Sequence, residues 1–314
     1  MKNRIKNTLF VLCSLVIGSL FLASCNGEEM YDKEMYKPVL YLLSGSENVY
    51  TVVYPFKEDN AVGYFSVGCG GSLSNPEEIT VQLEKDTVLF DLYNRTNFVF
   101  DSAAYARLLP EDSYVIENYT IKFPANSPEQ YVKVPIKVNQ QGLSPDSIYF
   151  IPLAIKSVSK YEVNPEKKNV LFRVAVENDY AEQITQTNYY LRGTIRKNDV
   201  ATPMPYSGSK IAQPLSKDEI RLFAGNLTQS NKSTLEDINK NSIIVKINED
   251  KSVIVRSYDT IEVEQLEAPN YNRYYTLKDT NGKDVEYIDL YYRYKLAGSN
   301  DWYEVKGSMQ RMYS

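Results

Sequence analysis

Residues 39–55 read VLYLLSGSENVYTVVYP, and this stretch decides the fold class. Val39–Leu43 is a short apolar run that ends at Ser44-Gly45, and Val49–Tyr54 is a second run that ends at Pro55. Short runs that are rich in β-branched and aromatic residues and end at Gly or Pro are typical of β-strands. Because no helical pattern separates runs at this spacing, the sequence predicts short strands of an antiparallel sandwich.

Runs of the same kind continue along the chain. In the first half, the further predicted strands are Ala61–Val67, Ile79–Leu83, Tyr119–Phe123, Tyr131–Val138, Tyr149–Ser157 and Val170–Val176. In the second half they are Tyr189–Ile195, Ser242–Asn248, Ser252–Tyr258, Ile261–Leu266, Tyr271–Leu277, Val285–Leu296 and Trp302–Met309, with hairpin turns at Asn281-Gly282 and Gly298-Ser299.

Two short helices are predicted between these strands. The first is Ser102–Leu109, which Asp101 would cap. The second is Lys217–Ala224, where Ser216 and Glu219 match a capping box. Everything else in the pattern indicates strands and turns, so the fold class is expected to be all-β.

The length of 314 residues favours two domains. Residues 38–180 are expected to form an immunoglobulin-like antiparallel sandwich. Residues 188–314 are expected to form an antiparallel β-barrel of lipocalin-like type or a strongly curved sandwich. The polar residues between them, 181–187, are expected to be a connector.

The N-terminus has the pattern of a signal peptide. A cationic start, KNRIK over residues 2–6, precedes the apolar run Leu9–Leu22, which is too short to span a bilayer convincingly. The run closes on Leu22-Ala23-Ser24-Cys25, which resembles the lipobox of bacterial lipoproteins. We therefore expect residues 1–24 to be cleaved and Cys25 to be lipidated. An ordinary secretory signal with a chance cysteine is the alternative.

After the lipidated cysteine, residues 25–37 are expected to form an acidic tether. Acid-rich starts of this kind resemble the signal that sends lipoproteins of Bacteroidota to the cell surface, and a merely polar linker is the alternative. The resemblance implies a protein in the outer membrane that faces the cell exterior. Because no later run is long and apolar enough for a membrane helix, lipid alone would anchor it.

Composition excludes several classes of function. The net charge of −5 gives no electrostatic footprint for nucleic acid. Histidine is absent, which removes Ser-His-Asp and Cys-His catalysis and nearly every zinc site. Cys69 would be the single thiol left after processing, and no pattern pairs two carboxylates as glycoside hydrolysis requires. We expect no catalytic residue, no metal and no cofactor.

Three segments resemble a known family. They are Asp91-Leu92-Tyr93-Asn94, Tyr105–Tyr114 (YARLLPEDSY) and Leu143–Leu153 (LSPDSIYFIPL). Together they resemble the N-terminal β-sandwich domain of Bacteroidota surface lipoproteins from glycan-utilisation loci, a domain also found ahead of some secreted endoglycosidases. The resemblance covers about residues 37–180, and the second half is similar to the C-terminal domain often paired with it.

The resemblance implies a non-catalytic surface lipoprotein of a polysaccharide-capture system. Its partners would be a polysaccharide or oligosaccharide and, in the membrane, a TonB-dependent transporter with its partner lipoprotein. A structural or adhesin-like lipoprotein without a small ligand is a rival interpretation. A glycosidase accessory protein or an unrecognised carboxylate enzyme is a third.

The densest aromatic patch lies near the C-terminus and is the candidate ligand site. Sugars place C–H groups against aromatic faces, while their hydroxyls seek charged and amide side chains. The candidate contacts are Trp302, Tyr303, Tyr291, Tyr292, Arg293 and Tyr274. Since side chains alternate along a strand, Tyr287, Asp289 and Tyr291 should share one face and Tyr292 and Tyr294 the other. One face must be core, and Trp302 itself is open to either interpretation.

A short motif recurs along the chain. Asp followed by Ser or Thr and then Ala, Val or Ile resembles the acceptor pattern for O-glycosylation of exported proteins in Bacteroidota. The candidate acceptors are Thr87, Ser102, Ser147 and Thr260.

Overall fold

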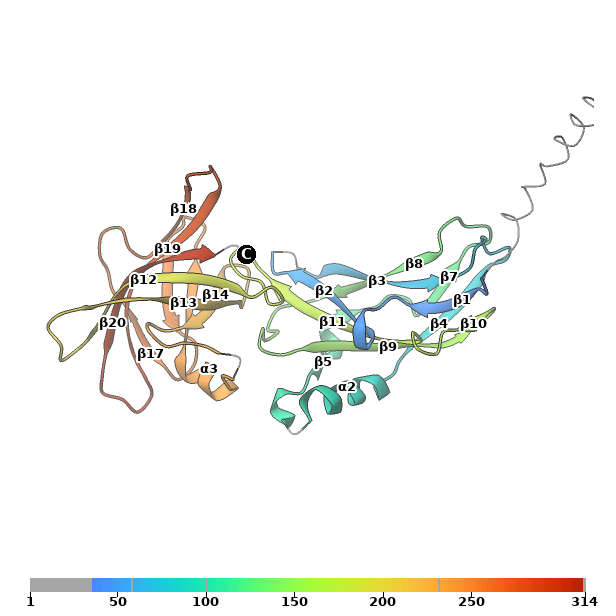
Figure 1. Ribbon diagram of the computed structural model, residues 1–314, viewed down its shortest axis with the longest axis horizontal. Helices are drawn as coiled ribbons and strands as arrows, with labels where there is room; N and C mark the ends of the chain where they lie inside the picture. Colours follow the sequence, from blue (N-terminus) through green and yellow to red (C-terminus); the bar gives the residue numbers. More distant parts are fainter. Residues whose placement is uncertain (1–35, 58, 100, 231, 313–314) are drawn as a thin grey trace, which may run out of the picture.

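The computed structural model describes residues 36–57, 59–99, 101–230 and 232–312. Two β-rich parts lie end to end, the N-terminal part on the right of Figure 1 and the C-terminal part on the left. The predicted all-β class is confirmed, since strands hold far more of the chain than helices do. The expected signal peptide, Cys25 and most of the acidic tether lie outside the described residues.

The N-terminal part is a sandwich of two sheets. The first has the order β10 (Glu162–Val163), β1 (Val39–Leu42), β3 (Ala61–Cys69), β8 (Tyr131–Val138) and β6 (Tyr114–Val115). The second has the order β2 (Val49–Pro55), β11 (Asn169–Glu177), β9 (Tyr149–Val158), β4 (Ile79–Lys85) and β7 (Thr120–Phe123), with β5 (Arg107–Leu108) beside β9. Alternate residues such as Phe65, Ile136 and Phe172 fill the space between the sheets.

The sandwich is not purely antiparallel, which corrects the prediction. Strand β2 runs parallel to β11 over its whole length, and β10 and β5 also pair in parallel with their neighbours. The chain leaves the first sheet after β1 and joins the edge of the second as β2. It therefore meets β11 in the same direction, an arrangement that a hairpin cannot produce.

The helices of the N-terminal part differ from the prediction. Helix α2 (Val88–Phe98) packs Phe90 against the second sheet, edge-on to Phe150 at 6.4 Å between ring centroids. The predicted helix at Ser102–Leu109 is wrong. Asp101 does accept hydrogen bonds from two following N–H groups, but only the 3₁₀ turn η2 (Ser102–Ala104) forms, because β5 then pairs with β9. The other 3₁₀ turns are η1 (Ser46–Asn48) and η3 (Glu111–Ser113).

The C-terminal part is a nearly closed barrel, which confirms the barrel alternative. Its sheet has the order β16 (Val253–Ser257), β15 (Ser242–Ile247), β14 (Glu219–Phe223), β13 (Met204–Pro214), β12 (Thr187–Lys197), β20 (Tyr303–Met312), β19 (Asp284–Lys295) and β17 (Glu262–Gln265), and β18 (Arg273–Lys278) pairs with β19. Strands β16 and β17 meet at the seam, where the Val255 N–H donates to Gln265 Oε1 at 2.8 Å. The barrel thus has few unpaired strand edges.

The predicted helix at Lys217–Ala224 is wrong, because those residues contain strand β14. The helix of this region is α3 (Leu235–Asn241), which Thr234 begins with a capping box. No helix of the described residues is long and apolar enough to cross a membrane.

Two glycines face each other where β12 and β20 pair. Gly193 and Gly307 are direct cross-strand partners. A Cβ atom on Gly193 would lie 2.2 Å from the carbonyl oxygen of Lys306 and 2.5 Å from the Cα of Gly307. The close approach of the two backbones thus requires glycine here.

The junction between the two parts is closely packed. Ala181 is fully buried in the barrel core, and Asn178 Nδ2 donates to the carbonyl oxygens of Ser216 and Glu219 at 2.7 and 2.9 Å. Gln183 Nε2 donates back to the N-terminal part, to the carbonyl oxygens of Pro145 and Ser147. The connecting segment is therefore fixed to both neighbours by direct hydrogen bonds.

Candidate functional site

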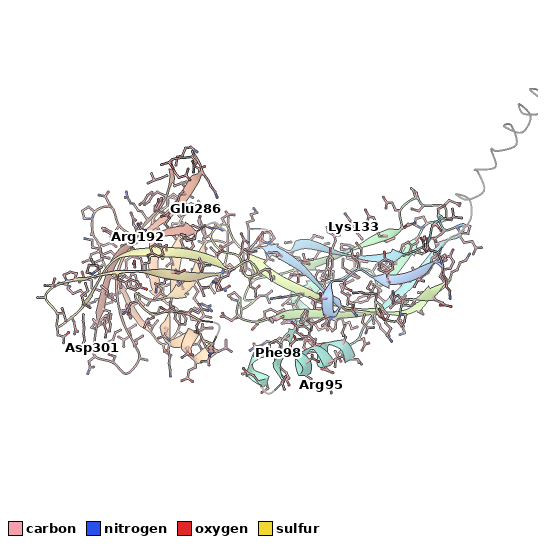
Figure 2. The ribbon with its side chains drawn as sticks, viewed as in Figure 1. Arg95, Phe98, Lys133, Arg192, Glu286 and Asp301 are labelled. Atoms are coloured by element: carbon pink, nitrogen blue, oxygen red, sulfur yellow. The ribbon has the colours of Figure 1, made fainter. Side chains whose placement is uncertain are left out.

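Strand alternation divides the C-terminal aromatic residues between the barrel interior and its outer surface. On β19, Ile288, Leu290, Tyr292 and Tyr294 are buried in the core, while Tyr287, Tyr291 and Arg293 lie on the outer side and stay partly exposed. We call the outer rings Tyr271, Tyr275, Tyr287, Tyr291 and Trp302 the aromatic face. Figure 2 labels Arg192 and Asp301 on this half of the molecule.

Strand register brings charges together across the aromatic face. Glu304 of β20 lies opposite Arg196 of β12 on one side and Arg293 of β19 on the other. It forms an ion pair with Arg196 and accepts a hydrogen bond from the Tyr291 hydroxyl at 3.1 Å. Arg293 Nε donates to Glu264 of β17 at 2.7 Å. Charges of opposite sign therefore alternate along this row, and each carboxylate has a cation.

Trp302 is half-buried beside this row. The Arg293 guanidinium lies 4.6 Å from the centre of its ring, and the Lys295 ammonium lies 5.4 Å away. Its carbonyl oxygen accepts the Asn198 N–H at 2.9 Å, which fixes the turn. The structure therefore places Trp302 on the outer surface, with cations over its ring, and not in the barrel core.

The tyrosines of the aromatic face carry cations in the same way. Lys306 Nζ lies 4.8 Å from the ring centre of Tyr271 and 5.1 Å from that of Tyr291. Tyr275 stacks on Tyr287 at 5.3 Å, and the Arg273 guanidinium lies 4.8 Å from the Tyr275 ring. Such cation–π contacts are worth about 0.5–1 kcal/mol at exposed sites. They orient the rings and cover part of their area.

The other three candidate contacts pack against the core. Tyr292 is 1% exposed and its hydroxyl accepts the Gly225 N–H at 2.8 Å, so a surface ligand cannot reach it. Burial raises the pKa of its phenol well above the usual range. Tyr303 stacks on the buried Tyr294 at 5.4 Å, and Tyr274 packs edge-on against Tyr180 at 5.3 Å. Of the six candidates, the outer surface thus brings together Trp302, Tyr291 and Arg293.

The aromatic face combines neutral phenol groups with paired charges. Burial first, and then the hydrogen bond to Glu304, raise the pKa of the Tyr291 phenol, so it remains a neutral donor. Asp289 is held by Arg273 Nε at 3.1 Å and by the Tyr275 hydroxyl at 3.3 Å. Among the residues that the structure describes, no group of three or more Cys, Asp or Glu side chains could hold a metal ion. The surface offers ring faces, cations and hydroxyls.

The four candidate O-glycosylation residues differ in solvent exposure. Thr87, Ser102 and Thr260 are exposed. Ser147 is only 8% exposed, because the adjacent Asp146 joins the interface between the two parts of the molecule. Any transferase would have to reach Ser147 before the chain folds.

Family models and solved structures of the same architecture match this chain. One family model, described as an N-terminal domain, matches residues 31–162, and a model described as the corresponding C-terminal domain matches residues 168–310. No curated protein matches the chain. Among solved structures, a protein of unknown function from Bacteroides ovatus is 18% identical, with a TM-score of 0.63 over 87% of this chain and 94% of that one.

Two further solved structures share the fold. A multidomain protein including DUF1735 from Bacteroides ovatus is 18% identical, with a TM-score of 0.62 over 86% of this chain and 93% of that chain. An auxiliary nutrient binding protein from Bacteroides thetaiotaomicron is 16% identical, with a TM-score of 0.55 over 85% of this chain and 92% of that chain. At these identities, the likeness shows a common two-domain fold.

Proposed function

We propose a function for this chain from the premise that it belongs to the two-domain family whose N-terminal and C-terminal models match it. In this proposal the chain is a non-catalytic lipoprotein of the outer membrane that faces the cell exterior and binds glycan for a polysaccharide-capture system. Lipid on Cys25 would tether it. A TonB-dependent transporter and its partner lipoprotein would take up what it captures.

The observation that carries the proposal is the aromatic face. Trp302, Tyr271 and Tyr291 present rings on one outer surface, and Arg293, Lys306 and Glu304 stand between them. Ring faces can receive the C–H groups of a sugar, while the charged side chains bond its hydroxyls. Each such contact is weak, and tethering many copies to one membrane raises the avidity for a polymer that carries repeated sites.

The solved structure described as an auxiliary nutrient binding protein supports this direction, since it has the same two-domain fold. A lipid-anchored binder needs a surface that remains open to large polymers. The outer side of a barrel provides such a surface more readily than the interior, which buried tyrosines fill here.

One observation favours a second function, that of a structural or adhesin-like lipoprotein. Cations lie over most rings of the aromatic face, and the carboxylates Glu304, Glu264 and Asp289 are paired. A surface whose groups already satisfy one another is also what a solvated wall of a scaffold requires.

Affinity electrophoresis separates the two functions. The mature protein is run through gels that contain starch, yeast mannan, xylan, laminarin, polygalacturonate or heparin. For a glycan binder, at least one polymer retards wild type, and Trp302→Ala weakens the retardation several-fold. Tyr64→Ala removes a ring of similar size from the exposed surface of β3 and is the matched control. No retardation by any polymer would support the structural function instead.

A further inference from the structure

A groove of about 680 Å³ lies between the two parts of the molecule, away from the aromatic face. One wall comes from the loop after α2 and from β5, and the other from β13 and the start of α3, which Figure 1 shows on either side of the junction. Binding sites of 300–1,000 Å³ are often found at domain interfaces. The size and place of the groove are therefore those of a ligand site.

An ion pair between the two parts holds the walls of the groove at a fixed separation. The side chains of Arg221 of β14 and of Asp146 are 0% and 9% exposed. The Arg221 guanidinium donates hydrogen bonds to both carboxylate oxygens of Asp146. The Nη2–Oδ1 distance is 2.8 Å. Because a bidentate pair fixes both distance and angle, the groove is preformed and not a product of chance contact.

Two amide side chains in the groove have hydrogen-bonding groups that the protein does not use. The Oε1 atoms of Gln213 and Gln229 are buried, and within the described part of the chain neither has a hydrogen-bond partner. Arg221 Nε, next to Gln213 across the β13–β14 pair, is also buried and unpartnered among those residues. An unmet buried polar group is destabilising, so two amides of this kind in the lining of one groove need an explanation.

A hydroxyl of a ligand can form the hydrogen bonds that these amides lack. The oxygen and nitrogen of a glutamine amide are assigned from their partners, and here either assignment leaves one group unmet. A hydroxyl can donate to the amide oxygen or accept from the amide nitrogen, once a rotation of the glutamine side chain turns that buried group toward the groove. The rest of the lining is of the same kind, with side chains of Gln186, Ser230, Ser233 and Thr234.

The charges around the groove cancel. Asp101 and Glu236 face it from opposite walls, as do Arg107 and Lys232, while Asp146 is neutralised by Arg221. A lining with no excess of either sign gives a charged ligand no electrostatic advantage. Tyr105 adds one aromatic ring to the wall.

We propose that this interdomain groove binds a segment of an uncharged glycan through its hydroxyls. The inference rests on the proposed function for its ligand class, and it names a different place and a different mode of binding. The aromatic face lies on β18, β19 and β20, whereas the groove uses β13, the loop before α3 and the N-terminal sandwich. The two regions can therefore be removed separately.

Gln213→Met tests the proposal because it keeps the length of the side chain and removes the unmet amide. If the amide serves a ligand, the variant keeps or slightly raises the melting temperature, since a buried polar group without a partner is lost. Affinity for whichever of starch, mannan, xylan or laminarin retards wild type falls about tenfold. Gln229→Met should behave alike, and Gln141→Met, on an exposed loop of the sandwich, is the control.

Hydrogen–deuterium exchange with the retarding polymer locates the contact directly. Protection in β13 and in residues 226–238 is the expected result, and it should be unaffected by raising salt, because the interaction is uncharged. Wild-type affinity in both glutamine variants, with protection confined to β19 and β20, overturns the groove and leaves the proposed function standing. A clear drop in the melting temperature of Gln213→Met would show that the Gln213 amide stabilises the fold, and this result also overturns the proposed groove site. Failure of all polymers to bind overturns the proposed function first.

Discussion

Breaking the ion pair between Arg221 and Asp146 is expected to destabilise the protein strongly. Asp146→Ala removes the carboxylate and leaves the guanidinium of Arg221 buried without an opposing charge. The Tyr258 ring, whose centre is 5.4 Å from the guanidinium, offers a weak cation–π contact in place of a charge. The guanidinium must then either remain desolvated or regain water by opening the interface.

The burial of Arg221 and Asp146 determines how much unfolding free energy is lost when the pair is broken. Removing one partner of a buried pair costs about 3–5 kcal/mol when the other stays buried. For a protein of this size, that corresponds to a fall of about 5–8 °C in the melting temperature. Replacing both groups with apolar ones should cost less than about 1 kcal/mol, because the desolvation of two charges is avoided at the same time.

A double-mutant cycle in urea measures this coupling. Asp146→Leu, Arg221→Met and the double variant are compared with wild type, and the coupling energy should exceed about 2 kcal/mol. The coupling should change little with salt, since buried pairs are poorly screened. Lys122 and Glu78, an exposed pair of the sandwich at 2.9 Å, provide the control cycle, in which about 0–1 kcal/mol is expected. Additive effects of Asp146→Leu and Arg221→Met would refute the reasoning.

Three other perturbations have expected outcomes. Lys210 is 2% exposed inside the barrel, and burial lowers the pKa of its ammonium group to about 7. From about pH 7 to pH 10 the unfolded chain therefore binds more protons than the native one, and the unfolding free energy should rise with pH across that window. Lys210→Met should remove this rise and be the more stable form at pH 7, as urea titrations at several pH values would show. Gly193→Val should prevent β12 from pairing with β20 and leave insoluble protein, whereas Ser207→Val on exposed β13 should not. Cys25→Ala should block lipidation and processing, so a mature-sized, membrane-retained band on an immunoblot would contradict the lipobox.

Strands of the sandwich could be predicted because their two faces meet different surroundings. In β8, YVKVPIKV, Val134, Ile136 and Val138 are buried and the residues between them are exposed or partly so, which gives a pattern with a period of two. The parallel pairing of β2 with β11 left no such signal, since pairing direction depends on the path of the chain between sheets.

Strand β14 shows why the local sequence pattern predicted a helix where a strand forms. Its residues EIRLF are buried on both faces, so no alternation is visible, and a nearby Ser and Glu imitate a helix cap. The glutamate instead forms an ion pair with Arg256, and Ser216 Oγ donates to Asp218. A charged residue within an apolar run was the available clue, because Arg221 can be buried there only with a partner from elsewhere in the chain.

The candidate site was predictable to the extent that it lies on one hairpin. Alternation along β19 correctly separated Tyr291 from Tyr292, whereas the turn before Trp302 left its position open, and only the structure places its ring beside Arg293 and Lys295 on the outer surface. The groove was not predictable, since Tyr105, Asp146 and Gln213 come from three distant segments. Only the register of the barrel and its orientation against the sandwich bring these residues to one place.

The two surfaces make different demands on a ligand. On most rings of the aromatic face a cation already lies against the ring, so a sugar that stacks on that side must displace it, and the loss of the cation–π attraction offsets part of the stacking energy. In the groove, hydroxyls would meet the side-chain oxygens of Gln213 and Gln229, which have no partner to give up among the described residues. Satisfying an unmet buried group stabilises a complex more than exchanging one satisfied interaction for another. Selectivity among glycans should therefore depend on the groove, and the aromatic face should contribute mainly avidity for the polymer.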